Sequence, residues 1–331
     1  MNADPDARRV PYEGLDPGTV LDAVESLGLW TDGRMLALNS YENRVYQVGL
    51  EQAEPVVVKF YRPGRWESMA ILEEHAFALE LVEHEIPVVA PLEIQGETLH
   101  IHRGFRYAVY PRRGGRSPDL DDPDALEWLG RFLGRIHAVG AIKPFRHRPR
   151  LTIEDLGERA VRTVQEMGLI PEHLLAAYST VSRDVLDRVR AAWERAGAVG
   201  TLRLHGDCHP GNILWTEAGP HFVDLDDAMS GPAVQDLWML LSGERMEMTR
   251  QLSDLLAGYE DFRDFDRREL HLLEALRTLR ILNYSAWLAR RWHDPAFPHA
   301  FPWFGSGRYW EDHVLALREQ AALMDESPLV V

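Results

Sequence analysis

Three oxygen-bearing side chains lie close together in the second half of the sequence, at spacings that suit phosphoryl transfer. Asp207 precedes Asn212 by five residues, and Asp224 directly follows the apolar pair Phe222-Val223. Phosphoryl transfer requires little covalent chemistry from a protein; it requires a positioned nucleophile and cations that spread the developing charge. A carboxylate can accept the proton of an attacking hydroxyl, while an amide oxygen and a second carboxylate can bind Mg²⁺. Asp207, Asn212 and Asp224 supply one group for each of these roles.

The elements that must position these side chains divide into a β-rich first part and a helical second part. An N-terminal arm is expected over residues 1–18, and a charged, turn-rich linker over residues 111–124. The apolar periodicity predicts helices over residues 19–29, 69–85, 126–137, 158–195, 236–260 and 267–293. Strands are predicted over residues 35–38, 44–48, 55–61, 98–102 and 106–110. The segment 202–226, which holds all three candidate residues, is expected to be an island of short strands and loops within the helical part.

Composition and charge exclude several classes of protein. The formal net charge is −16, without a basic stripe, so a nucleic-acid partner is not expected. No apolar run reaches the roughly 20 residues that a membrane helix requires, and no membrane partner is expected. Cys208 is the single cysteine, which excludes an internal disulfide and fits a reducing, cytoplasmic location. We expect a monomer.

The motifs around these residues resemble a known family. LHGDCHPGNILW followed by FVDLDD is similar to the catalytic motifs of the aminoglycoside phosphotransferase and choline kinase superfamily. Together with SYENRVYQV, VVKFYRPGRW, ILEEH, DLDDAMSGPAVQDLWMLL and RRWHDPAFP, they resemble the stress response kinase A family of bacterial Ser/Thr kinases. The resemblance implies an α+β, bilobal, protein-kinase-like fold. Residues 1–110 would form a small antiparallel-sheet N-lobe with the arm, the nucleotide-covering loop and the lysine strand. Residues 111–331 would form a larger helical C-lobe with the catalytic and metal-binding loops and the acceptor site.

The same resemblance assigns roles to the three residues of the island. It implies that Asp207 is the catalytic base and that Asn212 and Asp224 are the Mg²⁺ ligands. Asp236 would brace the catalytic loop from the following helix.

In the N-lobe, the resemblance implies that Lys59 contacts the α- and β-phosphates of ATP. Glu74 is our choice for its ion-pair partner, although spacing alone does not separate Glu74 from Glu73. Ser40 would lie in the turn that covers the phosphates, and Tyr110 would belong to the hinge around the adenine.

The sequence departs from the protein-kinase pattern in two places. No glycine-rich loop precedes Lys59, so a Ser/Asn turn must cover the phosphates instead. Eleven residues separate Asp224 from Asp236, and Ser230 is the one hydroxyl among them. We therefore predict that no activation-loop switch operates in this segment.

The expected activity is that of an ATP- and Mg²⁺-dependent Ser/Thr protein kinase of bacterial stress response, with protein hydroxyls as acceptors and with autophosphorylation. An alternative is a small-molecule kinase that phosphorylates an amino alcohol or an aminoglycoside hydroxyl, which the acidic balance and the short segment after Asp224 would suit. A non-catalytic nucleotide-binding module is a third class, disfavoured because Lys59 and all three transfer groups are present.

Other conspicuous residues have simpler interpretations. His205 and His209 are interpreted as loop-orienting rather than metal-binding, since the glycines and proline around them oppose a helix. Cys208 is interpreted as a small buried side chain rather than a redox-sensitive thiol. The tryptophans of the C-terminal region are expected to pack in the core, while the aromatic segment 297–303 is left open between core packing and a lining of the substrate cleft.

Overall fold

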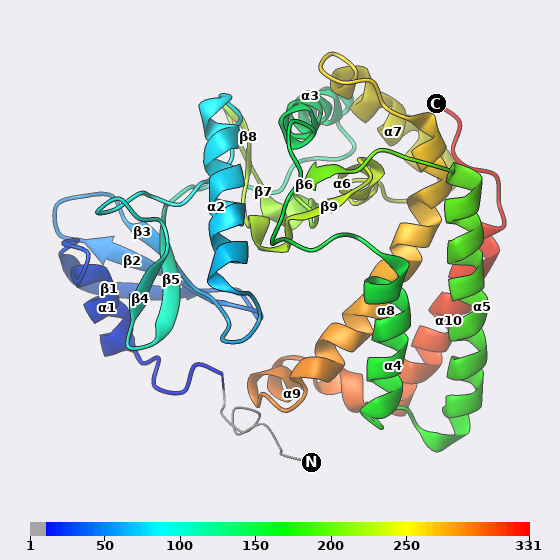
Figure 1. Cartoon of the computed structure of the whole chain (residues 1–331), viewed down its shortest axis with the longest axis horizontal. Helices are drawn as coiled ribbons and strands as arrows, with labels where there is room; N and C mark the ends of the chain where they lie inside the picture. The colour runs from blue at the N-terminus through cyan, green and yellow to red at the C-terminus, as the bar shows by residue number, and fades with distance from the viewer. Residues whose placement is uncertain (1–10) are drawn as a thin grey trace. The chain divides into compact units, whose positions relative to one another are not determined.

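The computed structural model describes residues 11–331 and places them in two compact units (Figure 1). The first unit comprises residues 11–118 together with Arg146–Arg148 and Gly211–Asp226. The second comprises Asp119–Phe145, Pro149–Pro210 and Asp227–Val331. The predicted division into functional lobes after residue 110 stays a prediction. Most of the island 202–226, from Gly211 onward, belongs to the first unit, which no sequence pattern indicated.

The first unit is built on a five-stranded antiparallel sheet. The strand order is β1-β2-β3-β5-β4, so each of the first three strands pairs with its neighbour in sequence. The strands are β1 (Thr31–Leu38), β2 (Arg44–Leu50), β3 (Val56–Phe60), β4 (His100–His102) and β5 (Phe105–Pro111). The short hairpin of β7 (Ile213–Thr216) and β8 (Gly219–Phe222) completes the unit.

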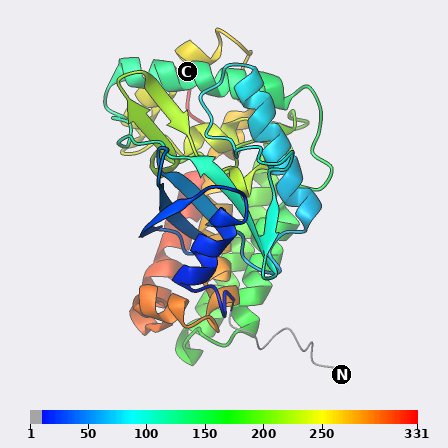
Figure 2. The same ribbon diagram turned by 90° about the vertical axis from the view of Figure 1, so that its left-hand side faces the viewer.

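One face of this sheet is covered by helix α1 (Pro17–Glu25), which Figure 2 shows in front of the strands. The helix begins at Pro17 because Asp16 caps it, accepting a hydrogen bond from the backbone N–H of Thr19. Its apolar side chains pack on those of the central strands; the shared core contains Val20, Ala23, Val24, Val48, Val58, Phe60, Tyr107 and Val109.

The described part of the expected N-terminal arm belongs to the core of the first unit. Residues 1–10 lie outside the described part of the chain. Tyr12, by contrast, is buried in the same core and donates a hydrogen bond to the backbone carbonyl of Glu42 (2.9 Å). The prediction of a mobile arm is therefore wrong for residues 11–18, because an aromatic anchor and a capped helix follow directly.

The second unit is mainly helical. Its helices are α3 (Pro123–Gly140), α4 (Arg159–Glu166), α5 (Glu172–Ala196), α6 (Val234–Trp238), α7 (Arg245–Tyr259), α8 (Leu273–Arg291), α9 (Ala296–Ala300) and α10 (Gly307–Met324). Two short strands, β6 (Leu202–Leu204) and β9 (Met229–Gly231), pair antiparallel within it. One unit with a small antiparallel sheet and one that is mainly helical confirm the predicted α+β class.

Two predicted helices are interrupted. The helix expected over residues 158–195 breaks between α4 and α5, where Gly168 adopts a φ of +65° and Pro171 follows. The helix expected over residues 236–260 breaks between α6 and α7, where Gly243 adopts a φ of +82°. A positive φ ends a right-handed helix, and glycine reaches it without steric cost.

The aromatic C-terminal region is mostly core. Phe297, Phe304 and Trp310 are buried, with Phe301 nearly so, among side chains of α4, α5, α8 and α10. Trp303 is the exception, with 41% of its surface exposed. Core packing therefore accounts for Phe297 and Phe301 of the segment 297–303, whose role the sequence left open, whereas Trp303 lies at the surface.

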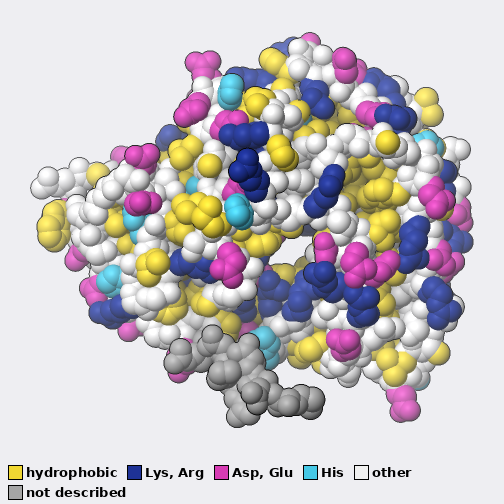
Figure 3. Space-filling view, viewed as in Figure 1, with side chains coloured by type: hydrophobic (Ala, Val, Ile, Leu, Met, Phe, Trp, Pro, Cys, Tyr) yellow, Lys and Arg dark blue, Asp and Glu magenta, His cyan; other side chains and the backbone are white. Residues whose placement is uncertain are grey.

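Acidic and basic side chains are interspersed over the molecular face in Figure 3. Many of them pair along single helices, as Arg188 does with Asp184 in α5 and Arg131 with Glu127 in α3. Exposed pairs of this kind contribute about 0–1 kcal/mol each. Because each pair carries no net charge, the formal net charge of −16 comes from the excess of acidic over basic side chains.

Candidate active site

A cavity of about 390 Å³ lies within the first unit. Most of its wall is apolar and comes from four strands of the sheet, helix α2 (Ser68–Glu83) and the β7–β8 hairpin. Its polar lining contains all six binding and metal residues predicted from the sequence: Ser40, Lys59, Glu74, Tyr110, Asn212 and Asp224. An apolar enclosure with a few convergent polar groups is the usual character of a small-molecule site.

Strand alternation explains why Lys59 faces this cavity. Side chains along a strand point alternately to the two faces of the sheet. Val58 and Phe60 of β3 pack under α1, so Val57 and Lys59 must point to the opposite face. On β5 the same alternation points Tyr110 toward the cavity, because Tyr110 lies directly opposite Val57 in the pairing of β3 with β5.

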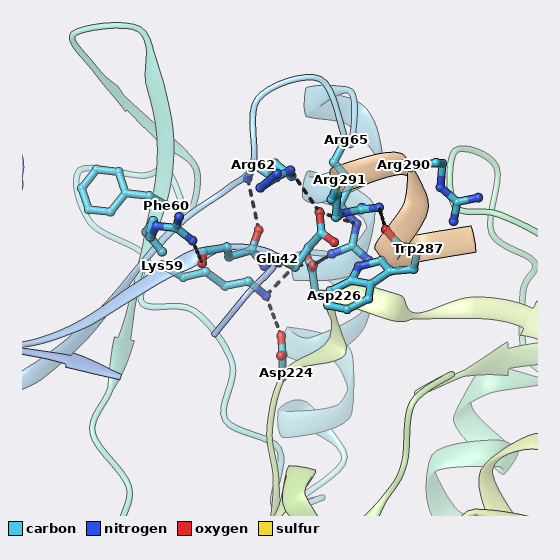
Figure 4. A network of polar contacts seen from close by, with 12 residues as sticks. Glu42, Lys59, Phe60, Arg62, Arg65, Asp224, Asp226, Trp287, Arg290 and Arg291 are labelled. Carbon is cyan, nitrogen blue, oxygen red and sulfur yellow. Dashed lines mark hydrogen bonds and ion pairs between the residues drawn. The ribbon is translucent and has the colours of Figure 1, made fainter. Parts of the chain in front are cut away.

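Lys59 is buried and held by carboxylates. Its ammonium lies 2.8 Å from Asp224 Oδ1 and 3.5 Å from Asp226 Oδ1 (Figure 4). Burial by itself would lower the pKa of Lys59, but the two aspartates outweigh burial and raise the pKa well above its ordinary value. The lysine is therefore a fixed positive charge at the wall of the cavity.

Asp226 is the residue of this site that sequence reasoning missed. It is buried, accepts a hydrogen bond from Asn43 Nδ2 (2.9 Å) and pairs with Arg65 as well as Lys59 (Figure 4). Burial opposes its ionisation, yet Arg65 and Lys59 hold the pKa of its carboxyl well below the usual range. Its position two residues after Asp224 was visible in the sequence, but no spacing rule identified it as the anion that anchors Lys59.

The two adjacent glutamates of α2 have different surroundings. Glu74 is buried and lines the cavity, with Ala78 one turn further along the same helix face. Burial raises the pKa of Glu74, although Lys59 counteracts the effect. Glu73 instead accepts hydrogen bonds from the backbone N–H groups of Arg146 (2.6 Å), His147 (2.6 Å) and Arg148 (2.9 Å). Glu74, not Glu73, is therefore the one in the cavity, while the close ion pairs of Lys59 are to the two aspartates.

Asn212 and Asp224 provide oxygen donors at the same cavity. The backbone N–H of Val223 donates to the carbonyl of Asn212 (3.0 Å), which ties the two short segments together. Asp224 adopts a φ of +59°, a left-handed conformation that is uncommon outside glycine, and half of its side chain is exposed. Such outliers are often found where a backbone is held for function.

This donor set fits a magnesium ion that is completed by a nucleotide. Mg²⁺ is usually held by one or two carboxylates together with substrate phosphates and water, not by a cage made only of protein. Within residues 11–331, no cluster of three or more His, Cys, Asp or Glu side chains could hold a metal ion. One amide oxygen and one carboxylate, from Asn212 and Asp224, fit such a nucleotide-dependent ion.

The loop that carries Asp207 belongs to the second unit and is braced by Asp236. The carboxylate of Asp236 accepts hydrogen bonds from the backbone N–H groups of His205 (2.9 Å) and Gly206 (2.8 Å). Gly206 has a φ of +85°, and a Cβ there would lie 2.1 Å from the carbonyl oxygen of Asp227, so only glycine fits. The predicted bracing by Asp236 is thus confirmed.

Asp207 itself is held by the side chains of Arg280 and His209. Arg280 of α8 donates to Asp207 Oδ1 (2.6 Å), and His209 Nε2 lies 3.5 Å from Oδ2. Burial opposes ionisation, but the bonds from His209 and Arg280 keep the pKa of the Asp207 carboxyl well below its usual range. No sequence pattern indicated that Arg280 would contact Asp207, because 73 residues separate the two. Cys208, next in the chain, is fully buried, as expected of a packing residue.

A buried glutamate of the short helical segment Arg267–Leu272, which binds the first residue of α6, gives the protein a testable pH dependence. Glu269 accepts a hydrogen bond from the backbone N–H of Val234 (2.8 Å), and burial raises its pKa to about 7. Because the folded pKa exceeds the unfolded value, its contribution to stability is complete below about pH 4.5 and is lost as the pH rises through 7. Glu269→Gln keeps an acceptor oxygen but does not titrate. It should therefore remove this pH dependence, which amounts to at most ~3 kcal/mol in the free energy of unfolding.

Chemical denaturation at several pH values between 5 and 8 measures that effect. The free energy of unfolding of Glu269→Gln should fall less across this range than that of the unaltered protein. The exposed Glu319→Gln is the matched control and should leave the slope unchanged. Parallel curves for all three proteins would contradict the prediction.

Comparisons with known proteins define the class of this chain. The model of the phosphotransferase enzyme family matches residues 35–273. Stress response kinase A of Escherichia coli (strain K12) is 47% identical over 318 residues, 96% of each chain. Serine/threonine protein kinase RdoA of Salmonella typhimurium is 46% identical over the same share of each. The chain therefore belongs to the phosphotransferase enzyme family, and it is a kinase that transfers phosphate to a hydroxyl acceptor.

Solved structures support the fold. An amicoumacin kinase in complex with AMP-PNP, Ca²⁺ and Ami has a TM-score of 0.74 at 18% identity, covering 100% of this chain and 98% of the other. A microcompartment-associated aminopropanol kinase has a TM-score of 0.70 at 17% identity, covering 92% and 96%. At these identities the likeness establishes the shared kinase-like fold.

None of the helices described is long and apolar enough to cross a membrane.

Proposed function

We propose that the protein is an ATP- and Mg²⁺-dependent Ser/Thr protein kinase of bacterial stress response, working as a cytoplasmic monomer and able to phosphorylate itself. The observation that carries the proposal is the cavity of the first unit, which gathers a buried lysine, an asparagine and an exposed carboxylate against an apolar wall. The names of the relatives that are 46–47% identical support protein hydroxyls and a stress response.

In the proposed mechanism, the apolar wall of the cavity takes the adenine, with Tyr110 at the hinge. Lys59 binds the α- and β-phosphates, and the turn of Ser40 covers them. Asn212 and Asp224 would hold Mg²⁺, which, when bound, neutralises charge that develops on the phosphates. Glu74 supports the position of Lys59 from α2.

Asp207 acts on the acceptor. Its carboxylate orients the hydroxyl and takes its proton as the hydroxyl oxygen forms a bond to the γ-phosphorus. The bond from that phosphorus to the bridging oxygen breaks, and ADP leaves with the electron pair. The brace from Asp236 to the two backbone N–H groups fixes the loop on which Asp207 stands.

A small-molecule acceptor is the second candidate. It is favoured by the names of the structural neighbours, one an amicoumacin kinase and one an aminopropanol kinase, and by the eleven residues between Asp224 and Asp236. We prefer protein hydroxyls because the relatives with those small-molecule names are 17–18% identical, whereas the stress response kinases are 46–47% identical over nearly the whole chain.

Incubation of the pure protein with γ-labelled ATP and Mg²⁺ tests this proposal. Three reactions are needed: protein alone, protein with generic protein acceptors such as casein, and protein with amino alcohols and aminoglycosides. Label in protein bands on Ser or Thr is the expected result. Label confined to the small molecules would replace the proposal with the second candidate.

The short segment after the metal-binding loop leads to a separate prediction. Ser230 lies in β9, where its backbone N–H donates to Pro149 and its carbonyl accepts from Leu151. A half-buried residue fixed in a strand is a poor switch, so Ser230→Ala should retain turnover within about twofold, the usual range for a substitution that breaks no buried network. Steady-state kinetics on protein freshly treated with phosphatase provides the check. A requirement for phosphorylated Ser230 would contradict it.

A further inference from the structure

A second cavity, of about 560 Å³, lies within the helical unit. It is formed by side chains of α8 and α10 together with Trp238 of α6, and its wall is mainly apolar and aromatic. The residues that line it include Trp238, Ile281, Tyr284, Tyr309 and Ala316. None of these belongs to the nucleotide-sized cavity of the first unit, so this cavity is available for the other substrate.

Arg280 connects this cavity to Asp207. Its side chain lines the cavity, is 46% exposed, and donates to Asp207 Oδ1 at 2.6 Å. Within residues 11–331, Asp207 is the single carboxylate paired with it. A guanidinium has five N–H donors in a planar fork, so one bond to Asp207 leaves further donors for an anion.

The other charged groups of the cavity wall are already compensated. Arg277 pairs with Glu274 (3.1 Å), donates to the carbonyl of Leu241 (3.1 Å) and lies over the ring of Trp238. Asp312 lies 3.7 Å from Arg308, one turn earlier on α10. His313 is buried, and burial lowers its pKa to about 4, so it is neutral at physiological pH.

The cavity therefore presents one half-exposed cation among aromatic rings, in a protein with a formal net charge of −16. A cationic amino sugar or amino alcohol would find a single carboxylate on this wall, and that carboxylate lies beside an arginine. An anionic group next to the acceptor hydroxyl would instead meet a guanidinium, which binds carboxylates through paired hydrogen bonds.

We propose that Arg280 determines acceptor specificity by binding an acidic side chain next to the Ser or Thr to be phosphorylated, an inference that rests on the protein-kinase function proposed above. The guanidinium holds Asp207 while no acceptor is bound. When an acidic acceptor segment enters, the aromatic wall packs on its neighbouring side chains and its carboxylate takes over the pairing with Arg280.

Asp207 becomes a stronger base when Arg280 leaves it to pair with the carboxylate of the acceptor. A carboxylate bound by an arginine accepts a proton poorly, because the cation stabilises its charged form. Once Arg280 pairs with the acceptor, Asp207 takes the hydroxyl proton while the oxygen–phosphorus bond forms and ADP departs. The acidic residue thus contributes to binding and also releases the base.

Peptides that differ only in the charge beside one serine test this inference. The flanking residues are Glu in the first peptide, Gln in the second and Lys in the third. Since hydrogen bonds to charged groups are worth about 1.5–3 kcal/mol, kcat/KM should be ~10–100-fold higher for the Glu peptide than for the Gln peptide. Arg280→Gln should bring this ratio close to one, and Arg280→Glu should make the Lys peptide the best substrate.

Arg250→Gln is the matched control, because Arg250 is 45% exposed, belongs to the same unit and pairs with Asp254 away from the cavity. It should keep the preference of the unaltered protein. An acidic preference that survives Arg280→Gln, or equal rates for all three peptides, would overturn this inference and leave the proposed function standing. Labelling of small amino alcohols with none in any peptide would overturn both.

The reversal by Arg280→Glu separates recognition from a structural role. A merely misfolded or loosened variant would lose activity toward all three peptides equally. A gain for the Lys peptide over the Glu peptide arises only if the side chain at position 280 contacts the flanking residue. Uniform loss across the three peptides would therefore count against the proposal.

Discussion

Replacement of Asp207 by Asn is expected to lower kcat by about 10²–10⁴-fold, the range in which a positioned general base contributes. The asparagine amide has nearly the same shape and can still accept the hydrogen bond from Arg280, so the loop should keep its conformation. It cannot take a proton from the acceptor. Because the nucleotide cavity is lined by residues of the other unit, ATP affinity should remain nearly unchanged.

Single-turnover kinetics and calorimetric titration with a non-hydrolysable ATP analogue separate these two effects. Asp261→Asn serves as the control, since Asp261 is an exposed aspartate of the same unit that pairs with Arg131 (3.1 Å). Its turnover should match that of the unaltered protein. Near-normal turnover of both Asp207→Asn and Lys59→Ala would refute the assignment of the site.

The second large effect is on stability. Asp226→Ala should lower the free energy of unfolding by about 3–5 kcal/mol, the usual cost of removing one partner of a buried ion pair. The substitution leaves the buried ammonium of Lys59 and the largely buried guanidinium of Arg65 without their shared carboxylate. It also removes the acceptor of Asn43 Nδ2. Urea or guanidinium denaturation at pH 7 measures the loss.

The contribution of Asp226 to the free energy of unfolding depends on pH, and the direction of the change is defined. The folded pKa of Asp226 is depressed, so its stabilising contribution is complete above the unfolded value of about 3.9 and is lost as the pH falls below it. The difference between the unaltered protein and Asp226→Ala should therefore persist from pH 5 to pH 8. It should shrink only in acid.

An exposed pair of the first unit is the control for Asp226. Asp22 is 51% exposed and pairs with Arg103 at 2.9 Å. Asp22→Ala should cost no more than about 1 kcal/mol, since solvent screens such pairs. A loss below 1 kcal/mol for Asp226→Ala would mean that the buried network does not support the cavity wall.

The sequence predicted those features that depend on short-range patterns. The β-rich first part and the helical second part followed from the change of hydrophobic period along the chain, whereas the kinase-like fold class was implied by the resemblance of the motifs. The comparisons confirm the fold class and the family. The five-residue gap from Asp207 to Asn212 and the strand around Lys59 are local patterns too. Their catalytic roles stay predictions, although the six predicted binding residues do line one cavity.

The features that escaped prediction depend on contacts between distant parts of the chain. Asp226 accepts a hydrogen bond from Asn43, 183 residues away in the sequence, and Asp207 accepts one from Arg280, 73 residues away. No local spacing therefore indicates either pair. Tyr12 was assigned to an arm because nothing near it in sequence predicts the core that it enters. Glu74, our choice from the sequence, does line the cavity, but two adjacent glutamates do not reveal the rotation of α2 that separates Glu74 from Glu73.

Comparison of the phosphoproteomes of cells that carry the active protein and cells that carry Asp207→Asn tests the central claim most directly. The account predicts a set of phosphorylated Ser and Thr residues that disappears in the variant strain and includes sites on the kinase itself. Restoration of the active gene should bring them back. Identical phosphoproteomes, together with loss of a phosphorylated small molecule from the variant cells, would contradict it.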